Sequence, residues 1–279
     1  MSEYEGIVIP GEEIYYAHVL DPEFKKLELP PTSDVHYGNH LFSLHHFQRH
    51  IQYLLDTPNT YTFLCGDLCE SSIRTSKGDI FKQVGSPKDQ RDWMIEKLMP
   101  IKHKILGAVA GNHENRIRNE TSMDITEDIA KALNIPYRNE GMLVKISFGS
   151  GNDRHDDRPY TYFGYFTHGY GGARTASSKA VKVERSSSYI HASFYCMSHD
   201  HVANAAPVIY LMPDNRTKID EATGFTIGKI IANRKMLIKS NAYVKWGGYS
   251  ELGGFSPSDL ETPIIMMAGE GKPKVRVLV

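Results

Sequence analysis

The stretch that decides the fold is GAVAGNHENR, residues 107–116. It begins as an apolar run with the character of a buried strand, and it ends in an amide, an imidazole and a carboxylate. Such a strand either runs out into an ordinary loop or delivers its polar groups to a site. The two outcomes are distinguished by whether other polar clusters arrive at the same place.

Four more polar clusters follow apolar segments that we expect to be strands. Because strand ends in α/β folds converge on one edge, where ligands bind, we expect the clusters to meet there. The five clusters, in chain order, are Asp34-Val35-His36, Gly66-Asp67, Gly111-Asn112-His113-Glu114, His168-Gly169 and His199-Asp200-His201.

Each cluster taken alone has an ordinary structural explanation. The Gly-Asp pair at 66–67 is typical of a turn closed by the aspartate side chain. The polar run at 112–114 would suit a helix N-terminus with a favourable first-turn acid. His168 would suit a turn between glycines, whereas His199 and His201 alternate, so that both rings can face one side. The order and context of all five together favour a metal site.

The donor types in these clusters define the kind of metal. Carboxylate, amide and imidazole groups suit Mn, Fe, Zn or Mg, and there are more donors than one ion needs. One aspartate can bridge two ions, and a pair of ions roughly 3.5–4 Å apart can clamp a phosphoryl group and activate a water. No cysteine lies among the donors, which is a poor fit to a structural zinc site.

Together, the five clusters resemble the signature of the calcineurin-like metallophosphoesterase superfamily, and Gly66-Asp67-Leu68-Cys69-Glu70 extends the second of them. The matches occur in the family's order and span residues 34 to 201. The resemblance implies an α/β fold of four layers, in which two mixed β-sheets pack together with helices outside. It also implies hydrolysis of a phosphate ester by a metal-activated water at a dinuclear centre.

The resemblance also assigns metal ligands. Asp67 would bridge both ions, with manganese the first expectation and iron, zinc or nickel the alternatives. The remaining ligands would be Asp34, His36 and His201 for one ion, and Asn112, His168 and His199 for the other.

The residues around the ligands carry further expectations. By resemblance, His113 would lie beside the phosphate and protonate the leaving group, as a near-neutral imidazole can. Asn112 and Arg116 are candidate substrate contacts, although Arg116 would equally suit stabilisation of its loop. Glu114 would orient its neighbours. Ser198 replaces the family's usual glycine and would be strained if its φ were positive.

The substrate is left open by these motifs. Basic residues in 170–186 would form a loop at the mouth of the site or, on the ordinary interpretation, a solvated linker and helix. Aromatic and basic residues in 233–255 would stack on bases or simply belong to a half-buried hairpin. We favour a phosphodiester or nucleic-acid substrate, as in the DNA-repair nuclease and phage-type branches. The alternatives are a phosphomonoesterase for nucleotides or small molecules, and a non-catalytic scaffold.

Composition sets the broad class. The chain has 279 residues, 41% of them hydrophobic and 23% charged, as in soluble globular proteins. We expect a single domain over 1–279, with a catalytic core at about 30–210 and a β-rich extension at 211–279. The net charge of -1 gives no reason to expect tight non-specific nucleic-acid binding, although it leaves room for a local basic groove.

The cysteines and the N-terminal segment indicate the compartment. The three cysteines, Cys65, Cys69 and Cys196, lack the spacing of a disulfide framework, so we expect small buried residues near strand ends. The sequence begins without the pattern of a signal peptide, and no segment has the ~20 apolar residues of a membrane span. We therefore expect a soluble, cytoplasmic protein that acts away from membranes, with homo-oligomerisation left open.

Local patterns predict the remaining elements. Helical spacing of apolar residues predicts helices at 41–55, 90–101 and 126–135. Residues 1–30 are expected to be irregular or edge-strand material, and the polar segment 71–89 an exposed loop. The second half of the chain is rich in strand patterns, which favours a mixed α/β sandwich over a doubly wound fold.

Overall fold

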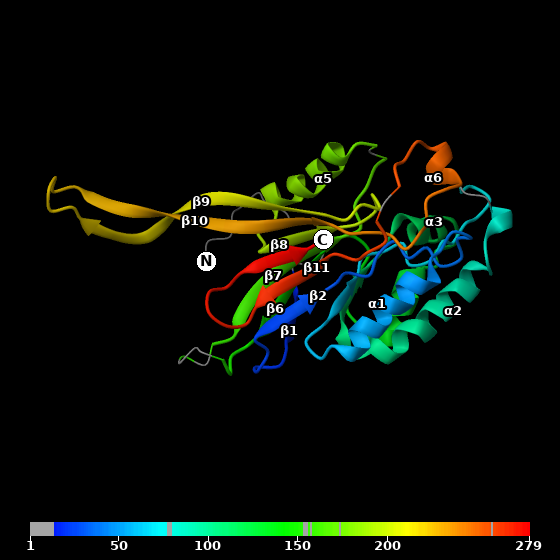
Figure 1. Ribbon diagram of the computed structural model, residues 1–279, viewed down its shortest axis with the longest axis horizontal. Helices are drawn as coiled ribbons and strands as arrows, with labels where there is room; N and C mark the ends of the chain where they lie inside the picture. Colours follow the sequence, from blue (N-terminus) through cyan, green and yellow to red (C-terminus); the bar gives the residue numbers. More distant parts are fainter. Residues whose placement is uncertain (1–13, 77–79, 153–155, 157, 173, 258) are drawn as a thin grey trace.

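The computed structural model describes residues 14–279 apart from 77–79, 153–155, 157, 173 and 258. Two layers of β-sheet form its centre (Figure 1). The strands are β1 (Tyr16–Val19), β2 (Lys26–Leu29), β3 (Thr62–Leu64), β4 (Ile105–Val109), β5 (Tyr137–Arg138), β6 (Met142–Phe148), β7 (Tyr160–Thr167), β8 (Phe194–Met197), β9 (Asn204–Ile219), β10 (Thr226–Lys239), β11 (Ile264–Ala268) and β12 (Val275–Leu278).

One sheet has six strands in the order β1-β6-β7-β8-β10-β9. The facing layer consists of two three-stranded sheets, β12-β11-β2 and β3-β4-β5. Parallel bridges from Glu28 to Thr60 and from Thr32 to Leu64 join β2 to the β3 side, so the two small sheets run on as one layer. Both layers contain parallel and antiparallel pairs.

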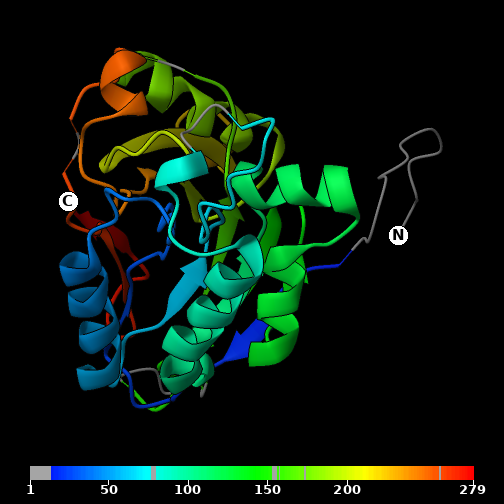
Figure 2. The ribbon, with the colours of Figure 1, turned by 90° about the vertical axis from the view of Figure 1, so that its right-hand side faces the viewer.

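Helices cover the outer faces of both layers. They are α1 (Leu44–Asp56), α2 (Pro87–Leu98), α3 (Asn112–Thr121), α4 (Ile125–Leu133), α5 (Ala176–Tyr189) and α6 (Tyr249–Leu252), with 3-10 turns at Ile80–Lys82 and Met99–Lys104. Figure 2 shows the molecule from the end opposite the projecting β9–β10 hairpin, with α5 on one side and α1, α2 and α4 on the other.

Three clusters of buried apolar residues separate these layers. The largest lies between the sheets and contains side chains such as Phe63 of β3 and Phe166 of β7, whose rings stack 4.1 Å apart. A second cluster joins β3 and β4 to α1, α2 and α4, and a third joins β7, β8 and β10 to α5. Helix, sheet, sheet and helix therefore form four layers, and the predicted mixed α/β sandwich is confirmed.

The predicted helices at 41–55, 90–101 and 126–135 are present as α1, α2 and α4, with shifted ends. Residues 16–19 form the edge strand β1, as expected, whereas residues 1–13 lie outside the described part. The hairpin expected at 233–255 is wrong. The real hairpin is β9–β10, and the chain after Lys239 turns into a loop and the short α6 because β10 ends where it pairs with the end of β8.

The C-terminal strands complete both layers of the sandwich. β10 lies between β8 and β9, and β11 pairs with β2 from the start of the chain. The three cysteines are buried and unpaired, which confirms that they are structural. Among the described residues, no helix combines the length and the apolar character needed to cross a bilayer.

Candidate metal centre

The polar clusters meet at one end of the sandwich. The chain reaches this end directly after β3, β4, β7 and β8 and a few residues after β2. Three sets of side chains lie close enough to hold an ion: Asp34, His36 and His201; His36, Asp67 and His113; and Asp67, His168 and His199. All seven expected ligands therefore contribute to one region, since Asn112 contacts His168.

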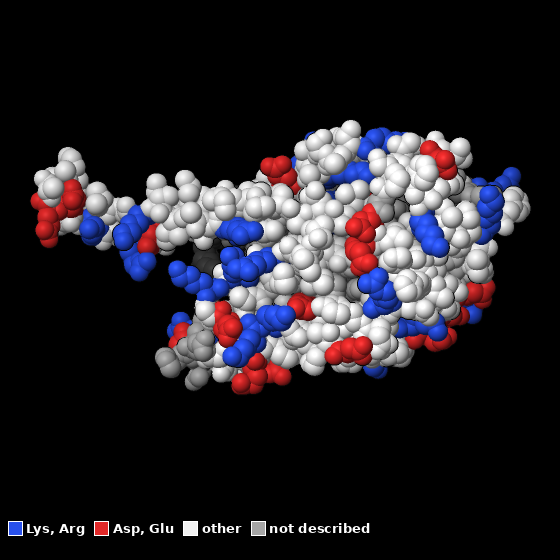
Figure 3. Space-filling view, viewed as in Figure 1, with Lys and Arg blue, Asp and Glu red and all other residues white. Residues whose placement is uncertain are grey.

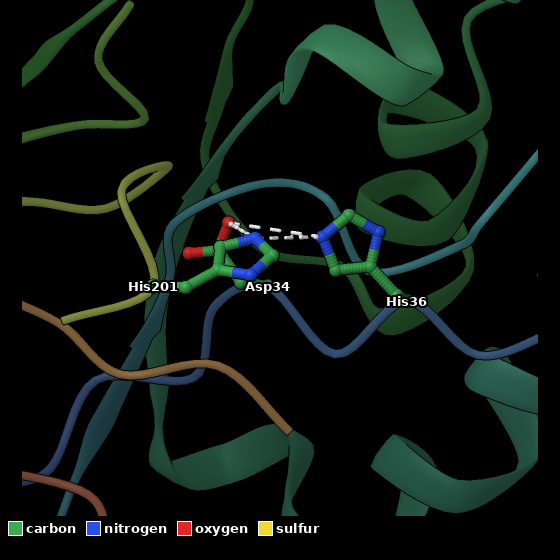
Figure 4. A group of neighbouring side chains, drawn as sticks. All are labelled: Asp34, His36 and His201. Carbon is green, nitrogen blue, oxygen red and sulfur yellow. Dashed lines mark hydrogen bonds and ion pairs between the residues drawn. The ribbon is translucent and has the colours of Figure 1, made fainter. Parts of the chain in front are cut away.

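The first set converges on Asp34 (Figure 4). Asp34 Oδ1 lies 3.2 Å from His201 Nε2 and 3.9 Å from His36 Nε2, and the two imidazole nitrogens are 3.1 Å apart. Ligands bound at right angles at about 2.1 Å lie about 3 Å from each other, so these three atoms can reach one ion. Asp34 Oδ1 is buried without a hydrogen-bond partner among the described residues, and a cation would satisfy it.

The second set converges on His168. Its Nε2 lies 3.2 Å from Asp67 Oδ2, 2.9 Å from Asn112 Oδ1 and 3.2 Å from His199 Nδ1. Asp67 Oδ2 also lies 3.8 Å from His36 Nε2, which belongs to the first set. Asp67 Oδ2 thus lies between the two sets of side chains, at the position where a ligand shared by two ions would lie.

The backbone at these residues is unusual. Eight described non-glycine residues have positive φ, and five of them are Asp34, His36, Asp67, His199 and His201. Each such conformation costs about 1–3 kcal/mol and persists only where the surroundings enforce it. Since five of the expected ligands share this strain, the fold holds their side chains in place at the expense of local backbone stability.

Ser198 does not share this strain. The concern that serine replaces a glycine required for positive φ does not apply, because the positive φ of 72° belongs to the next residue, His199. Ser198 is instead a buried residue whose carbonyl accepts a hydrogen bond from Lys239 Nζ at 2.7 Å.

Two glycines allow the loops of Asp67 and Asn112 to approach. Gly66 has a φ of +79°, and a Cβ on it would lie 2.5 Å from the backbone nitrogen of Gly111. A Cβ on Gly111 would lie 2.1 Å from both the backbone nitrogen and Oδ1 of Asp67. Only residues without side chains fit at both positions.

The first turn of α3 holds the Asp67 loop. Glu114 is buried, and its carboxylate accepts hydrogen bonds from the backbone nitrogens of Asp67, Leu68, Cys69 and Gly111 at 2.6–3.1 Å. Burial and the charge of Asp67 raise the pKa of Glu114 to about 7 despite these bonds. The 112–114 cluster thus begins a helix and also supplies the site, so both explanations of it apply.

Neighbouring acceptors orient two of the histidines. His36 Nδ1 lies 3.1 Å from Glu70 Oε2, and His168 Nδ1 lies 2.8 Å from the carbonyl oxygen of Cys65. A proton on each Nδ1 leaves the Nε2 lone pair facing the other donors, which is the arrangement of metal-binding histidines. Although burial would raise the pKa of Glu70, hydrogen bonding to His36 and its charge hold it at about 2.

The electrostatics of the centre favour ionised aspartates. Burial alone would raise the pKa of Asp67, but the charges of His168 and His113 hold it well below its usual range. The pKa of Asp34 is also lowered, because His201 outweighs the effect of burial. In return, Asp67 raises the pKa of His168 to about 10 against the effect of burial. The aspartates therefore attract protons here, or a metal cation in their place.

The turn that carries His199 and His201 is fixed by a buried ion cluster. Asp200 lies between them and accepts a hydrogen bond from Lys182 Nζ at 2.6 Å, while Lys239 Nζ is 2.7 Å from its other oxygen. Lys179 donates to the Asp200 carbonyl. The expectation that 170–186 is a solvated linker and helix is correct for the helix but wrong for these lysines, which are buried because Asp200 attracts them.

His113 lies at the edge of the centre. Its Nδ1 is 2.6 Å from the carbonyl oxygen of Glu70, so that nitrogen donates and Nε2 faces the metal ligands, 4.0 Å from Asp67 Oδ2. Arg116 lines the same cleft, and its guanidinium donates to Ser76 Oγ at 2.5 Å. Arg116 therefore ties the 71–76 segment to α3 at the border of the site.

Five of the seven expected ligands form the floor of a cleft of about 810 Å³, which lies in the range of small-molecule sites: His36, Asp67, Asn112, His199 and His201. Trp246 and Phe255, on either side of α6, form an aromatic wall, and the Trp246 indole donates to the Phe255 carbonyl at 2.7 Å. The guanidinium of Arg174 stacks over the Phe255 ring at 3.8 Å. Lys245 also lines this side.

The sequence identified the donors but missed much of what holds them. The motif gave Glu70 no separate role, whereas its carboxylate orients the His36 ring. The cluster around Asp200 was missed entirely. Spacing of Lys179 and Lys182 by one helical turn was the available signal, while Lys239 arrives from a strand forty residues after the motif.

No family model matches this sequence, and no curated protein is significantly similar to it. Some solved structures are similar in outline. A predicted phosphoesterase from Streptococcus pneumoniae aligns at 12% identity with a TM-score of 0.38, covering 91% of this chain and 90% of that one. Vacuolar protein sorting 29 from Cryptosporidium parvum aligns at 12% identity with a TM-score of 0.40, covering 91% and 98%.

A metallophosphoesterase from Sphaerobacter thermophilus aligns at 12% identity with a TM-score of 0.37, covering 87% of this chain and 83% of that one. Scores of this size are too low to establish a common fold. Any function of this chain is therefore to be inferred from the geometry of the candidate centre.

Proposed function

We propose that this chain is a metal-dependent phosphoesterase of the calcineurin-like type, with two metal positions that share Asp67. The observation that carries the proposal is the convergence of seven oxygen and nitrogen donors on two points joined by one carboxylate oxygen. Strain at five of these residues supports it, as does Asp34 Oδ1, which is buried without a hydrogen bond from a described residue, because a structural hydrogen-bond network would need neither.

The residues present fit a pair of divalent ions. Asp34, His36 and His201 would hold one ion, and Asn112, His168 and His199 the other. The mixture of carboxylate, amide and imidazole favours manganese, with iron, zinc or nickel as alternatives. When bound, such a pair supplies Lewis acidity to the phosphate and lowers the pKa of a water that can attack it.

His113 would protonate the leaving group. The hydrogen bond between its Nδ1 and the Glu70 carbonyl fixes the ring, so that Nε2 is the atom presented to the cleft. The side chain is 18% exposed, which leaves it accessible to a substrate on the metal floor. Asn112 would serve both as a ligand and as a phosphate contact, and Arg116 would contribute positive charge at the border.

The cleft favours a phosphodiester, in a nucleic acid or a nucleotide, over a small monoester. The aromatic wall of Trp246 and Phe255 offers faces on which a base can stack, and Arg174 and Lys245 provide positive charge beside it. A small phosphomonoester would use only the floor of the cleft. A phosphomonoesterase for nucleotides is the second candidate, since one stacked base satisfies the same wall.

Hydrolysis assays with metal-stripped protein test the reaction. Chromogenic monoester and diester substrates and single-stranded DNA would be compared with and without added Mn²⁺, using His113→Ala and, as a matched control, His103→Ala in the exposed turn before the other end of β4. We expect Mn²⁺-dependent diester cleavage that falls in His113→Ala and persists in His103→Ala. A preference for the monoester would support the second candidate, and absence of turnover with every metal would overturn the proposal.

Asp67→Asn distinguishes an enzyme from a scaffold of the same shape. The change keeps the side-chain volume and removes the shared charge, so an enzyme should lose about a thousandfold or more in activity. Asp56→Asn, at the exposed end of α1, is the control and should keep full activity. Equal activity in both variants would contradict the assignment of the bridging ligand.

A further inference from the structure

The β9–β10 hairpin extends far beyond the sandwich as an arm, defined here as residues 209–231 (Figure 1). β9 has 16 residues and β10 has 14, whereas β8, which flanks them, has four. From Ile209 to the turn, the arm reaches roughly 35 Å. It points away from the metal centre, because β10 runs from the tip towards the site.

One face of the arm continues the inner, core-facing side of the sheet. Met236 of β10 is buried between the two sheets, and alternate positions along the hairpin share its face. Further out on this inner face lie Ile209, Leu211 and Ile230, with 61%, 67% and 74% of their surface exposed. The apolar pattern of a core face thus continues where there is no second sheet to cover it.

Exposed apolar side chains in a continuous strip are unusual for a surface that contacts only water. Scattered exposed leucines are ordinary, but apolar strips on long strands mark surfaces that associate with another chain. An isolated two-stranded hairpin is also marginally stable by itself. Burial of the inner face against another surface would remove both difficulties.

The free edge of β9 is unsuited to pairing with a strand of another chain. Pro207 and Pro213 lack backbone donors, and within a ladder proline is tolerated only where its nitrogen faces outward. Between these prolines, the outward edge of β9 offers only the backbone donors of Ile209 and Leu211, and each proline interrupts the row. Association through the face of the arm is favoured over extension of the sheet at its edge.

Charge along the arm indicates what covers this face. Asp220 and Glu221 make the tip acidic, whereas Arg234 lies on the inner face at the base, and Arg276 is exposed on β12, which lies against β10. Figure 3 shows the acidic tip and the basic side chains gathered where the arm meets the body. Neither arginine forms an ion pair with a described residue. If two arms lie antiparallel, each acidic tip reaches the basic base of the other.

We infer that two copies of this chain associate by packing the inner faces of their arms in antiparallel, two-fold fashion. The contact is isologous, so the inner face of each arm, including Ile209, Leu211 and Ile230, is buried against the inner face of the other. The metal centres stay open at the opposite ends of the dimer. This inference is independent of the proposed phosphoesterase activity.

Sedimentation velocity of the full chain tests the inference. Leu211→Glu places a charge on the inner face, whereas Met212→Glu places it on the opposite face one residue away, where Met212 is 43% exposed. We expect a wild-type dimer at micromolar concentration, weakened about a hundredfold or more by Leu211→Glu and little changed by Met212→Glu. A monomeric wild type, or equal effects of the two changes, would overturn the inference.

Crosslinking tests the antiparallel direction. All three native cysteines are buried, so Glu221→Cys and Arg234→Cys each add one accessible thiol. A bis-maleimide should join the two single variants to each other when they are mixed. Crosslinking of Glu221→Cys only to itself would indicate parallel arms and contradict the antiparallel arrangement. Circular dichroism would verify that each variant is folded.

Discussion

The metal centre and the arm depart from ordinary folding rules in opposite ways. At the centre, side chains are buried and mutually bonded while the backbone is strained at five ligand positions. In the arm, the backbone is a β-ladder with one register shift, between Gly228 and Ile230, while large apolar side chains are exposed. Strain in the first region is maintained because burial and hydrogen bonds enforce it. The exposure in the second has no such compensation within one chain.

The contrast indicates what each region requires. A site that must hold donors about 3 Å apart needs tight packing around it and is sensitive to small changes. The arm makes few contacts with its own chain, so substitutions there should affect association and leave stability almost unchanged. Paired substitutions, one in the sandwich and one in the arm, should therefore differ in their effect on the free energy of unfolding.

Removing Lys239 should cause the largest loss of stability. Lys239→Met leaves Asp200 with one fewer buried cationic partner, and breaking a buried ion pair costs about 3–5 kcal/mol. Lys229→Met, on the exposed arm, should change the free energy of unfolding by no more than about 0.5 kcal/mol. Urea unfolding of both variants measures the difference, and equal midpoints would contradict the role given to the cluster.

Glycine substitutions should show the same contrast. Gly111→Ala forces a Cβ against Asp67 and should cost about 1–3 kcal/mol and most of the activity. Gly224→Ala, near the tip of the arm, meets no atom within 4 Å, so only its φ of +75° opposes the change, at about 1 kcal/mol. Thermal unfolding and hydrolysis assays check both, and unchanged activity in Gly111→Ala would show that the close approach is dispensable.

His50, buried in the sandwich, should make the free energy of unfolding depend on pH. It is buried beside Thr32, its Nε2 2.7 Å from the hydroxyl, and burial lowers its pKa to about 3. The unfolded chain takes up this proton near pH 6.5, whereas the folded chain does so only near pH 3, so stability falls as pH drops through this window. The loss should be about 2 kcal/mol between about pH 7 and about pH 5.

The matched variant is His50→Gln, which cannot take up this proton. Its free energy of unfolding should fall less steeply over the same pH range than that of the wild type. Parallel curves for the two proteins would mean that His50 titrates normally in the folded state.

The smallest effect on stability is expected in the arm. Leu211→Ser removes an apolar side chain that is already 67% exposed, so the unfolding free energy of the monomer should change by no more than about 0.5 kcal/mol. Unfolding at high dilution measures this change. A loss of several kcal/mol there would show that the arm is part of the cooperative core.

The sequence predicted the sandwich and the polar side chains that converge at one end of it, because strand ends and donor types are local signals. It offered a helix N-terminus at 112–114 only as an alternative, since NHENRIRNET has a single buried apolar residue, Ile117, and no helical stripe. The helix is instead fixed by Glu114 and the Asp67 loop, a contact over more than forty residues. Nor did it predict the arm's length, because 213–218 is polar and carries no strand pattern.

The ion pair between Asp200 and Lys239 could not be predicted from the sequence either, because it also joins residues far apart in the chain. A buried lysine at the end of β10 resembles any other strand-end lysine until the sheet places it behind His199 and His201. Local patterns identify groups capable of chemistry, but the long-range contacts that hold them depend on the sheet order. The donor side chains of the site could therefore be predicted, whereas the contacts that hold them in place could not.

Metal binding is the most direct test of the central claim, that two ion positions share Asp67. Equilibrium dialysis of the metal-stripped chain against Mn²⁺ would be compared between wild type and Asp67→Asn. We expect two ions for each wild-type chain and a marked loss of affinity for both in Asp67→Asn, with binding by Asp56→Asn unchanged. One ion or none in the wild type, or full binding by Asp67→Asn, would contradict it.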